Sequence, residues 1–230
     1  MSLLEKYKVI VFDLGGTLME YVRMPLNWSE YYPEAFRHVN EINNLNLSKQ
    51  DISKAVEILK LYNPRITKRE IEIDPEDMFI EILKAWNTNS KSIKKIIQDF
   101  FDGMNLKPVI FDYTKNLINI CKAHGCKVAC LTDLASGMPD YIFREDIAEI
   151  VNDFDLYVSS KICGYRKPNK AGIEYIANEF RVDTKEILLV GDEEKDKNTA
   201  NNANCDFIFI SDLKTIINPY IERKEQCLKR

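Results

Sequence analysis

Short apolar runs separated by stretches of helical periodicity recur along this chain, and this alternation constrains the fold most. The runs at residues 9–12, 127–131 and 187–190 each lead into polar residues. Apolar runs of this length that alternate with helical patterns are typical of a parallel sheet buried on both faces. In such sheets, ligands bind beyond the carboxyl ends of the strands. The polar residues that follow the runs are therefore expected to share one site.

The order of the expected elements indicates an α/β fold with a doubly wound parallel sheet. Between the first and second strands of that sheet, the sequence predicts four amphipathic helices with short connections, which form a small bundle. The first is expected over residues 29–42, and the second opens at a capping box formed by Ser48 and Asp51. We therefore expect a core domain from residues 1–20 and 106–230, and an inserted four-helix domain over residues 21–105.

Composition and charge argue against several classes of protein. The chain has 230 residues and a net charge of −4, and its basic residues form no long tract, so nucleic acid is not an expected partner. No apolar run approaches the roughly 18 residues that span a bilayer, and the N-terminus lacks the apolar region of a signal peptide. We therefore expect a cytoplasmic protein without a membrane partner.

The six cysteines form no C-x-x-C pair, which favours reduced thiols over a zinc site. Nothing in the sequence indicates an oligomeric state.

The polar residues after the first and last of these runs suggest phosphoryl chemistry. Asp13 enters a glycine-containing loop, where its carboxylate could attack phosphorus and form an aspartyl phosphate that water later hydrolyses. Because two anions meet in that step, a cation is needed between them. Asp13 and Asp192 could each give one oxygen to Mg2+, with the backbone carbonyl of Gly15 and waters as further ligands. Asp196 lies one helical turn beyond Asp192 and could bind the metal directly or through water.

Two further motifs are expected to bind the transferring phosphoryl group. Thr132 offers a hydroxyl and Lys167, in a neighbouring loop, offers a point charge. Backbone groups of Asp133 and Gly16 complete the predicted phosphate-binding set. Taken singly, an Asp after an apolar strand usually caps a turn, and Lys-Pro is a common dipeptide. The prediction depends on all these residues occurring in this order, each beside an expected strand.

The four motifs FDLGGTL, LTD, GYRKP and GDEEKD resemble those of the haloacid dehalogenase-like hydrolase superfamily, and the likeness covers nearly the whole chain, residues 8–210. The four inserted helices fall where subfamily I of that superfamily has its type-one cap. The resemblance implies a Rossmann-like core, Mg2+ dependence and, most often, phosphatase activity on a small phosphorylated metabolite. It also implies roles for individual residues, with Asp13 as the nucleophile, Thr132 and Lys167 as phosphate binders, and Asp192 and Asp196 as the acidic metal pair.

One departure from the family pattern concerns Gly15. Phosphatases of the family generally carry an aspartate at this position, which protonates the leaving group, and general acid–base assistance is worth about 10²–10⁴ in rate. Three hypotheses follow. In the first, the substrate is an acyl, aryl or anhydride phosphate, whose leaving group needs no proton. In the second, the chain binds phosphate without turnover. In the third, another residue donates the proton. The candidate donors are Glu20, Tyr21, Glu30 and His38.

Other chemistries share parts of this pattern. Dehalogenases of the superfamily place a tyrosine at the position of Gly15 and do not need the acidic pair. Phosphonatases form a Schiff base with a cap lysine, and the many lysines of residues 21–105 leave that branch open. Receiver domains of bacterial signalling also combine aspartates, Mg2+, Thr and Lys-Pro, but they lack a helical insertion and carry their acidic pair early. A non-catalytic interaction protein is the alternative from a different class.

Overall fold

The computed structural model describes residues 3–88 and 92–216. The chain divides into two compact units. One, which we call the sheet unit, comprises Met1–Glu20, Val109–Asp133 and Ile147–Arg230. The other, which we call the helical unit, comprises Tyr21–Pro108 and Leu134–Asp146. Each unit is built from segments that are far apart in the sequence.

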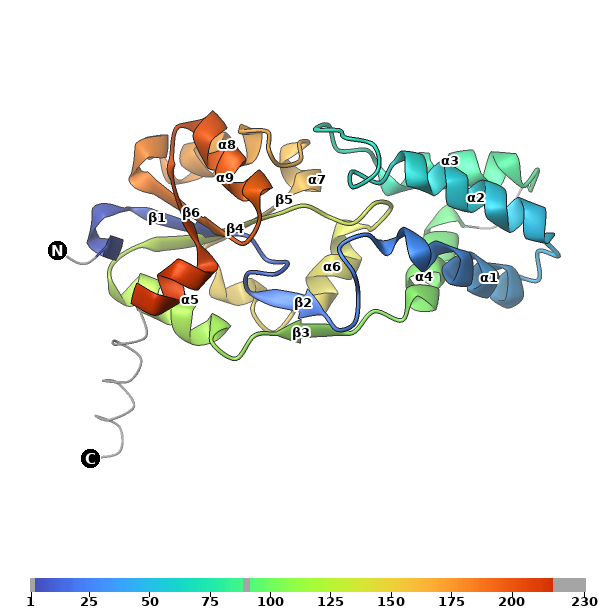
Figure 1. The fold of residues 1–230 in the computed structure, drawn as a ribbon, viewed down its shortest axis with the longest axis horizontal. Helices are drawn as coiled ribbons and strands as arrows, with labels where there is room; N and C mark the ends of the chain where they lie inside the picture. The colour runs from blue at the N-terminus through green and yellow to red at the C-terminus, as the bar shows by residue number, and fades with distance from the viewer. Residues whose placement is uncertain (1–2, 89–91, 217–230) are drawn as a thin grey trace, which may run out of the picture. The chain divides into compact units, whose positions relative to one another are not determined.

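The sheet unit contains a five-stranded sheet in the order β5-β4-β1-β6-β7 (Figure 1). All neighbouring strands are parallel, and Phe12 in the central strand lies opposite Cys130 and Val190. This arrangement confirms the α/β fold with a parallel sheet. The strands are β1 (Val9–Phe12), β4 (Lys127–Thr132), β5 (Leu156–Ser159), β6 (Ile187–Gly191) and β7 (Asp206–Phe209).

Helices cover both faces of this sheet, because its strands are apolar on both sides. Helices α8 and α9 pack on one face, and α5 packs against β4 on the other (Figure 1). The first interface is a buried apolar cluster in which Val11 and Leu189 of the strands meet Ile176 and Ala200 of the helices. The labelled helices and turns of the unit are η1 (Leu3–Lys6), α5 (Thr114–Ala123), η3 (Val151–Asp153), α7 (Ser160–Cys163), α8 (Ala171–Phe180), η4 (Thr184–Glu186) and α9 (Glu194–Ala203), and residues 210–216 are also helical.

The helical unit is held together by aromatic packing. Phe36, Phe79 and Phe100 are fully buried, and the ring of Phe36 lies 4.6 Å from that of Phe100 and 5.7 Å from that of Trp86. Such ring pairs add about 0.5–1.5 kcal/mol each beyond the area they bury. The helices of the bundle are α1 (Tyr32–Asn43), α2 (Lys49–Leu61), α3 (Pro75–Ala85) and α4 (Ile93–Met104), with the turn η2 (Trp28–Glu30) before them.

Local sequence signals explain where these helices begin. The Ser48 side chain accepts a hydrogen bond from the backbone N–H of Asp51, and the Asp51 carboxylate accepts one in return, so the predicted capping box is present. Asp74 caps α3, which has proline at its first position. The first helix begins at Tyr32 rather than at Ser29, because Trp28–Glu30 forms a separate 3-10 turn.

Two features of the fold were not expected from the sequence. Strand β2 (Met19–Tyr21) pairs with β3 (Pro108–Ile110) in a small separate sheet. Residues 134–146, which include α6 (Asp140–Asp146), group with the helical unit. Within that unit the Ser136 hydroxyl donates to the backbone oxygen of Tyr62 at 2.8 Å, and Met138 is buried. The helix expected over residues 141–151 stops at Asp146, because the following residues form tighter turns.

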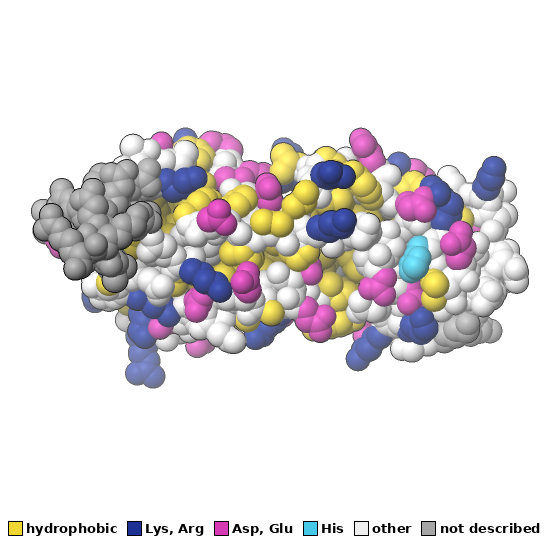
Figure 2. Space-filling model, turned by 90° about the horizontal axis from the view of Figure 1, so that it is seen from below, with side chains coloured by type: hydrophobic (Ala, Val, Ile, Leu, Met, Phe, Trp, Pro, Cys, Tyr) yellow, Lys and Arg dark blue, Asp and Glu magenta, His cyan; other side chains and the backbone are white. Residues whose placement is uncertain are grey.

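The surface carries charges of both signs. On the face drawn in Figure 2, lysine and arginine side chains alternate with aspartate and glutamate side chains among the residues shown in colour. Within residues 3–88 and 92–216, no helix has the length and apolar character needed to cross a membrane. The cysteines of that part of the chain are free thiols, and Cys227 lies outside the described residues.

Candidate active site

The carboxyl ends of the central strands bring the predicted site residues to one edge of the sheet. The Asp13 backbone N–H donates to the Val190 oxygen at 2.8 Å, which extends the β1–β6 ladder to this residue. Thr132 is the last residue of β4, is buried, and lies opposite Ser159 of β5. Asp192 follows the last residue of β6 directly. All of these residues belong to the sheet unit.

Three aspartates meet at this edge. Asp13, Asp192 and Asp196 each offer a carboxylate oxygen, and the three oxygens lie within 4.8 Å of one another. Asp13 and Asp196 are buried, whereas Asp192 is partly exposed. Hard oxygen donors at this spacing suit a hard divalent cation such as Mg2+ or Ca2+. The residues present therefore fit a divalent metal.

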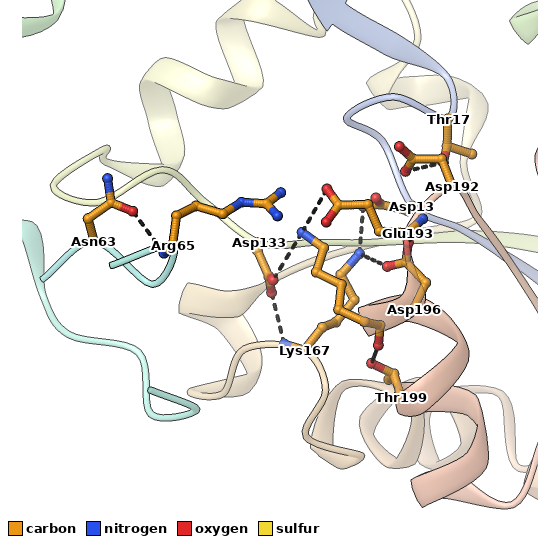
Figure 3. Close-up of polar contacts among 11 residues, drawn as sticks. Asp13, Thr17, Asn63, Arg65, Asp133, Lys167, Asp192, Glu193, Asp196 and Thr199 are labelled. Atoms are coloured by element: carbon orange, nitrogen blue, oxygen red, sulfur yellow. Dashed lines mark hydrogen bonds and ion pairs between the residues drawn. The ribbon is translucent and has the colours of Figure 1, made fainter. Parts of the chain in front are cut away.

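The Lys167 ammonium lies between two of these carboxylates. Its Nζ is 2.7 Å from Asp13 Oδ1 and 2.5 Å from Asp196 Oδ1, and only 1% of its side chain is exposed (Figure 3). The second oxygen of Asp196 accepts the backbone N–H of Glu193 at 3.0 Å. The Lys167 backbone N–H in turn donates to Asp133 Oδ1 at 3.0 Å. The loop that carries Lys167 is thus tied to the ends of two strands and to the first turn of α9.

Burial and crowding of like charges shift the pKa values in this site. Burial raises the pKa of Asp13 to about 7; the cations Lys167 and Lys195 oppose this rise and Asp196 adds to it. Burial also raises the pKa of Asp192, with Asp196 contributing to the shift. Although burial disfavours its charged form, Lys167 has a raised pKa because Asp13 and Asp196 surround it. Burial therefore disfavours the ionised forms of Asp13 and Asp192 even with Lys167 in place.

The two glycines after Asp13 have different surroundings. Gly16 has a φ of +76°, and a Cβ atom there would lie 2.2 Å from Asp192 Oδ2. Asp192 can approach the loop only because Gly16 has no side chain. Gly15 is exposed, and a Cβ atom there would meet nothing within 4 Å. An aspartate could therefore occupy position 15 without a clash at its Cβ.

Hydrogen bonds that the sequence did not reveal hold this loop in place. The Thr17 hydroxyl donates to Asp192 Oδ1 at 3.2 Å (Figure 3). The Tyr113 hydroxyl donates to the backbone oxygen of Thr17 at 2.7 Å, and the Thr114 hydroxyl donates to that of Leu18 at 2.7 Å. Thr17 lies inside the FDLGGTL motif and could have been singled out. Tyr113 and Thr114 carry no local signal, because they reach the loop only through the fold.

Asp133 and Lys195 form a second polar group at the site. The Lys195 Nζ lies 3.7 Å from Asp133 Oδ2 and 3.8 Å from Glu193 Oε1. Although burial works against it, the charges of Lys167, Lys195 and Arg166 lower the pKa of Asp133. Asp133 is therefore an ionised carboxylate whose closest contact is a backbone N–H. Lys195 stands at a variable position of the GDEEKD motif, so sequence reasoning gave it no role.

The candidate proton donors differ in their surroundings. In the helical unit, the Tyr21 hydroxyl donates to Asp146 Oδ2 at 2.6 Å. His38 is half-buried in α1 and packs where a Cβ atom on Gly103 of α4 would lie. Glu20 and Glu30 are exposed. These surroundings do not favour one candidate proton donor over the others.

A parallel sheet with aspartates beyond its central strands and a buried lysine between them is typical of α/β enzymes whose acidic site can hold a metal. The haloacid dehalogenase-like hydrolase family model matches residues 7–204, and the chain belongs to this family. This match confirms the family resemblance that the four motifs indicated, and it makes the chain a member of a hydrolase family.

Named relatives agree with this membership. A phosphoglycolate phosphatase from Vibrio vulnificus is 24% identical over 204 residues, which are 87% of this chain and 82% of that protein. The HAD hydrolase YfnB from Bacillus subtilis, solved bound to magnesium, is 14% identical with a TM-score of 0.53, over 92% of this chain and 99% of that one. A predicted phosphoglycolate phosphatase from Haemophilus somnus is 18% identical with a TM-score of 0.50, over 88% and 84%. These two structures support the fold alone.

Proposed function

We propose that this chain is a Mg2+-dependent phosphatase of a small phosphorylated metabolite, with Asp13 as its nucleophile. The sequence-based division gives a catalytic core over residues 1–20 and 106–230 and a cap over residues 21–105, and we propose the sheet unit as that core and the helical unit, which also takes in residues 134–146, as the cap. The observation that carries the proposal is the position of the Lys167 ammonium, 2.7 Å from Asp13 and 2.5 Å from Asp196. A buried cation beside a nucleophilic carboxylate is suited to neutralise a phosphoryl group that approaches it.

The chain's own residues account for both steps of such a reaction. A carboxylate oxygen of Asp13 attacks phosphorus, and the bond to the leaving oxygen breaks with its electron pair. Water then attacks the phosphorus of the aspartyl phosphate and returns the Asp13 carboxylate. In both steps Lys167 and the Thr132 hydroxyl bind phosphoryl oxygens, with backbone groups of Gly16 and Asp133 beside them. The charge of Lys167 also opposes the rise in the pKa of Asp13 that burial causes.

The proposed metal ligands are the three clustered aspartates and one backbone group. Asp13, Asp192 and Asp196 would hold Mg2+ together with the Gly15 carbonyl, and the ion would supply positive charge between the attacking carboxylate and the phosphoryl group. The clustering of three carboxylate oxygens within 4.8 Å of one another supports this assignment. Mg2+ commonly binds through a few carboxylates and keeps several waters, which suits a partly exposed Asp192.

A screen of phosphorylated metabolites tests the proposal. Purified protein is assayed for phosphate release with Mg2+ and with a chelator, and phosphoglycolate is included because two relatives carry that name. We expect release that requires Mg2+ and is lost in Asp13→Asn, which retains the shape of the carboxylate but not its nucleophilicity. Release that persists in Asp13→Asn would contradict the role of Asp13.

A second candidate function is phosphate binding without turnover, and the environment of Gly15 favours it. No side chain stands at position 15, where the family's general acid would lie. Comparing para-nitrophenyl phosphate with an alkyl phosphate separates the hypotheses, because only the alkyl leaving group depends strongly on a proton donor. Turnover of neither ester supports binding alone, and equal turnover of both points to a replacement donor. Gly15→Asp, which the open space allows, is expected to raise alkyl-phosphate hydrolysis if the missing acid limits the rate.

A further inference from the structure

We propose that Lys195 is a second phosphoryl-binding lysine, which leaves its ion pairs with Asp133 and Glu193 to bind an oxygen of the transferring group. This inference rests on the proposed phosphatase function and assigns a role to a residue of the GDEEKD motif to which sequence reasoning gave none. It follows from a difference between the two lysines of the site. Lys167 is locked in place, whereas Lys195 is held loosely.

The distances around the two ammonium groups show this difference. The Lys195 Nζ is 3.7 Å from Asp133 Oδ2 and 3.8 Å from Glu193 Oε1, both beyond the usual N–H···O range of about 2.7–3.2 Å. The Lys167 Nζ has contacts of 2.7 and 2.5 Å. Within residues 3–88 and 92–216, the Lys195 Nζ donates no hydrogen bond to a protein group. Its three N–H donors are therefore available to a ligand.

Lys195 is accessible from solvent and lies next to residues that are proposed to bind the phosphoryl group. Its side chain is 29% exposed, compared with 1% for Lys167, so it can move and can be reached from solvent. Its ammonium lies 3.7 Å from Asp133 Oδ2, and Asp133 directly follows Thr132 and accepts the Lys167 backbone N–H at 3.0 Å. Lys195 is thus next to the proposed phosphoryl-binding residues, yet it is not enclosed.

The carboxylates next to Lys195 explain why an anion would displace them. Asp133 Oδ1 accepts the Lys167 backbone N–H at 3.0 Å, so Asp133 stays where it is when Lys195 moves. Lysine carries its charge on a flexible stem, and a phosphoryl dianion attracts it more strongly than a carboxylate at 3.7 Å does. Lys195 would also offset the repulsion between the incoming phosphoryl group and the ionised Asp133.

Binding of inorganic phosphate to the full-length protein with saturating Mg2+, measured by titration calorimetry, tests this role. Charge-assisted hydrogen bonds contribute enough that Lys195→Gln is expected to weaken phosphate binding about tenfold or more. Lys195→Arg, which keeps the charge, is expected to retain most of the affinity. The matched control is Lys197→Gln on the same helix, where Lys197 is 46% exposed and pairs with Glu194 at 3.5 Å. That variant is expected to bind phosphate as the wild type does.

Three results would overturn the inference. Unchanged affinity in Lys195→Gln would show that the lysine only neutralises its neighbours. Equal losses in Lys195→Gln and Lys197→Gln would show a general effect of net charge. In the wild-type protein, phosphate is expected to protect Lys195 but not Lys197 from acetylation, as measured by mass spectrometry. The third result that would overturn the inference is the absence of that protection. This last measurement needs no variant and so does not depend on how a variant folds.

The same experiments separate this inference from the proposed function. If the wild type neither binds phosphate nor releases it from any ester, the phosphatase proposal fails, and the role of Lys195 fails with it. If the wild type binds phosphate or turns over a substrate, but Lys195→Gln binds phosphate equally well, only the role of Lys195 is wrong.

Discussion

Replacing Gly16 by alanine provides a sharp test of the site geometry. The residue has a φ of +76°, and the added Cβ would lie 2.2 Å from Asp192 Oδ2. To restore van der Waals contact, the Asp192 carboxylate has to retreat by about 1 Å, or the loop has to move by as much. Either shift alters the cluster of three aspartates that is proposed to bind the metal.

Two separate costs follow from this substitution. An alanine in the left-handed region costs about 1–2 kcal/mol of folding free energy, which urea unfolding measures. Displacement of a metal ligand by about 1 Å is expected to weaken metal binding about 10–100-fold and to lower kcat/KM by about 10²-fold. Metal affinity is measured by calorimetry on the purified protein, so this result does not depend on knowing the substrate.

Gly125→Ala is the matched control, because it should lower the unfolding free energy in the same way without weakening metal binding. Gly125 has a φ of +82°, and a Cβ there would meet nothing within 4 Å. It lies between α5 and β4, before the amino end of that strand, so its variant is expected to lose stability but to bind the metal normally. Equal metal affinity in Gly16→Ala and Gly125→Ala would refute the idea that Gly16 makes room for Asp192.

Three further predictions concern ionisable groups. Because the pKa of Asp13 is raised to about 7, the folded state binds the proton more tightly than the unfolded state does. In urea titrations of the metal-free proteins, the unfolding free energy of the wild type should therefore fall relative to that of Asp13→Asn between about pH 4 and 7. Partial burial would raise the pKa of Asp155, but the backbone N–H of Val128, at 2.9 Å, and the charge of Lys127 lower it. Asp155→Asn should therefore have a lower unfolding free energy than the wild type at pH 7, and the difference should shrink towards pH 3. Burial raises the pKa of Cys121 and Cys205 to about 12, so mass spectrometry should find a thiol reagent on them at pH 8 only after unfolding.

The parts of the fold that follow from local pattern could be predicted from the sequence. The central strands could be found because they are apolar on both faces, and α2 because Ser48 and Asp51 form a capping box. The polar residues after these strands were expected to meet because parallel strands end at a common edge. The structure brings Asp13, Asp192 and Asp196 together, and their roles in catalysis remain predictions.

Features that depend on contacts between distant segments could not be predicted. Strands β2 and β3 have only three residues each, which is too short for a periodic signal. Tyr113 supports the loop after β1 through a hydroxyl bond to Thr17, almost a hundred residues away in sequence. Lys195 has no distinguishing motif, and only its distances from Asp133 and Glu193 single it out.

The discontinuity of the helical unit matters for protein engineering. A fragment that spans only residues 21–108 would lack residues 134–146, and with them the hydrogen bond from Ser136 to Tyr62 and the buried side chain of Met138. A chimera that exchanges the helical unit with that of a related enzyme therefore needs two donor segments rather than one. The second of these begins at Leu134, two residues after Thr132, so the graft junction would fall beside the proposed phosphate-binding residues.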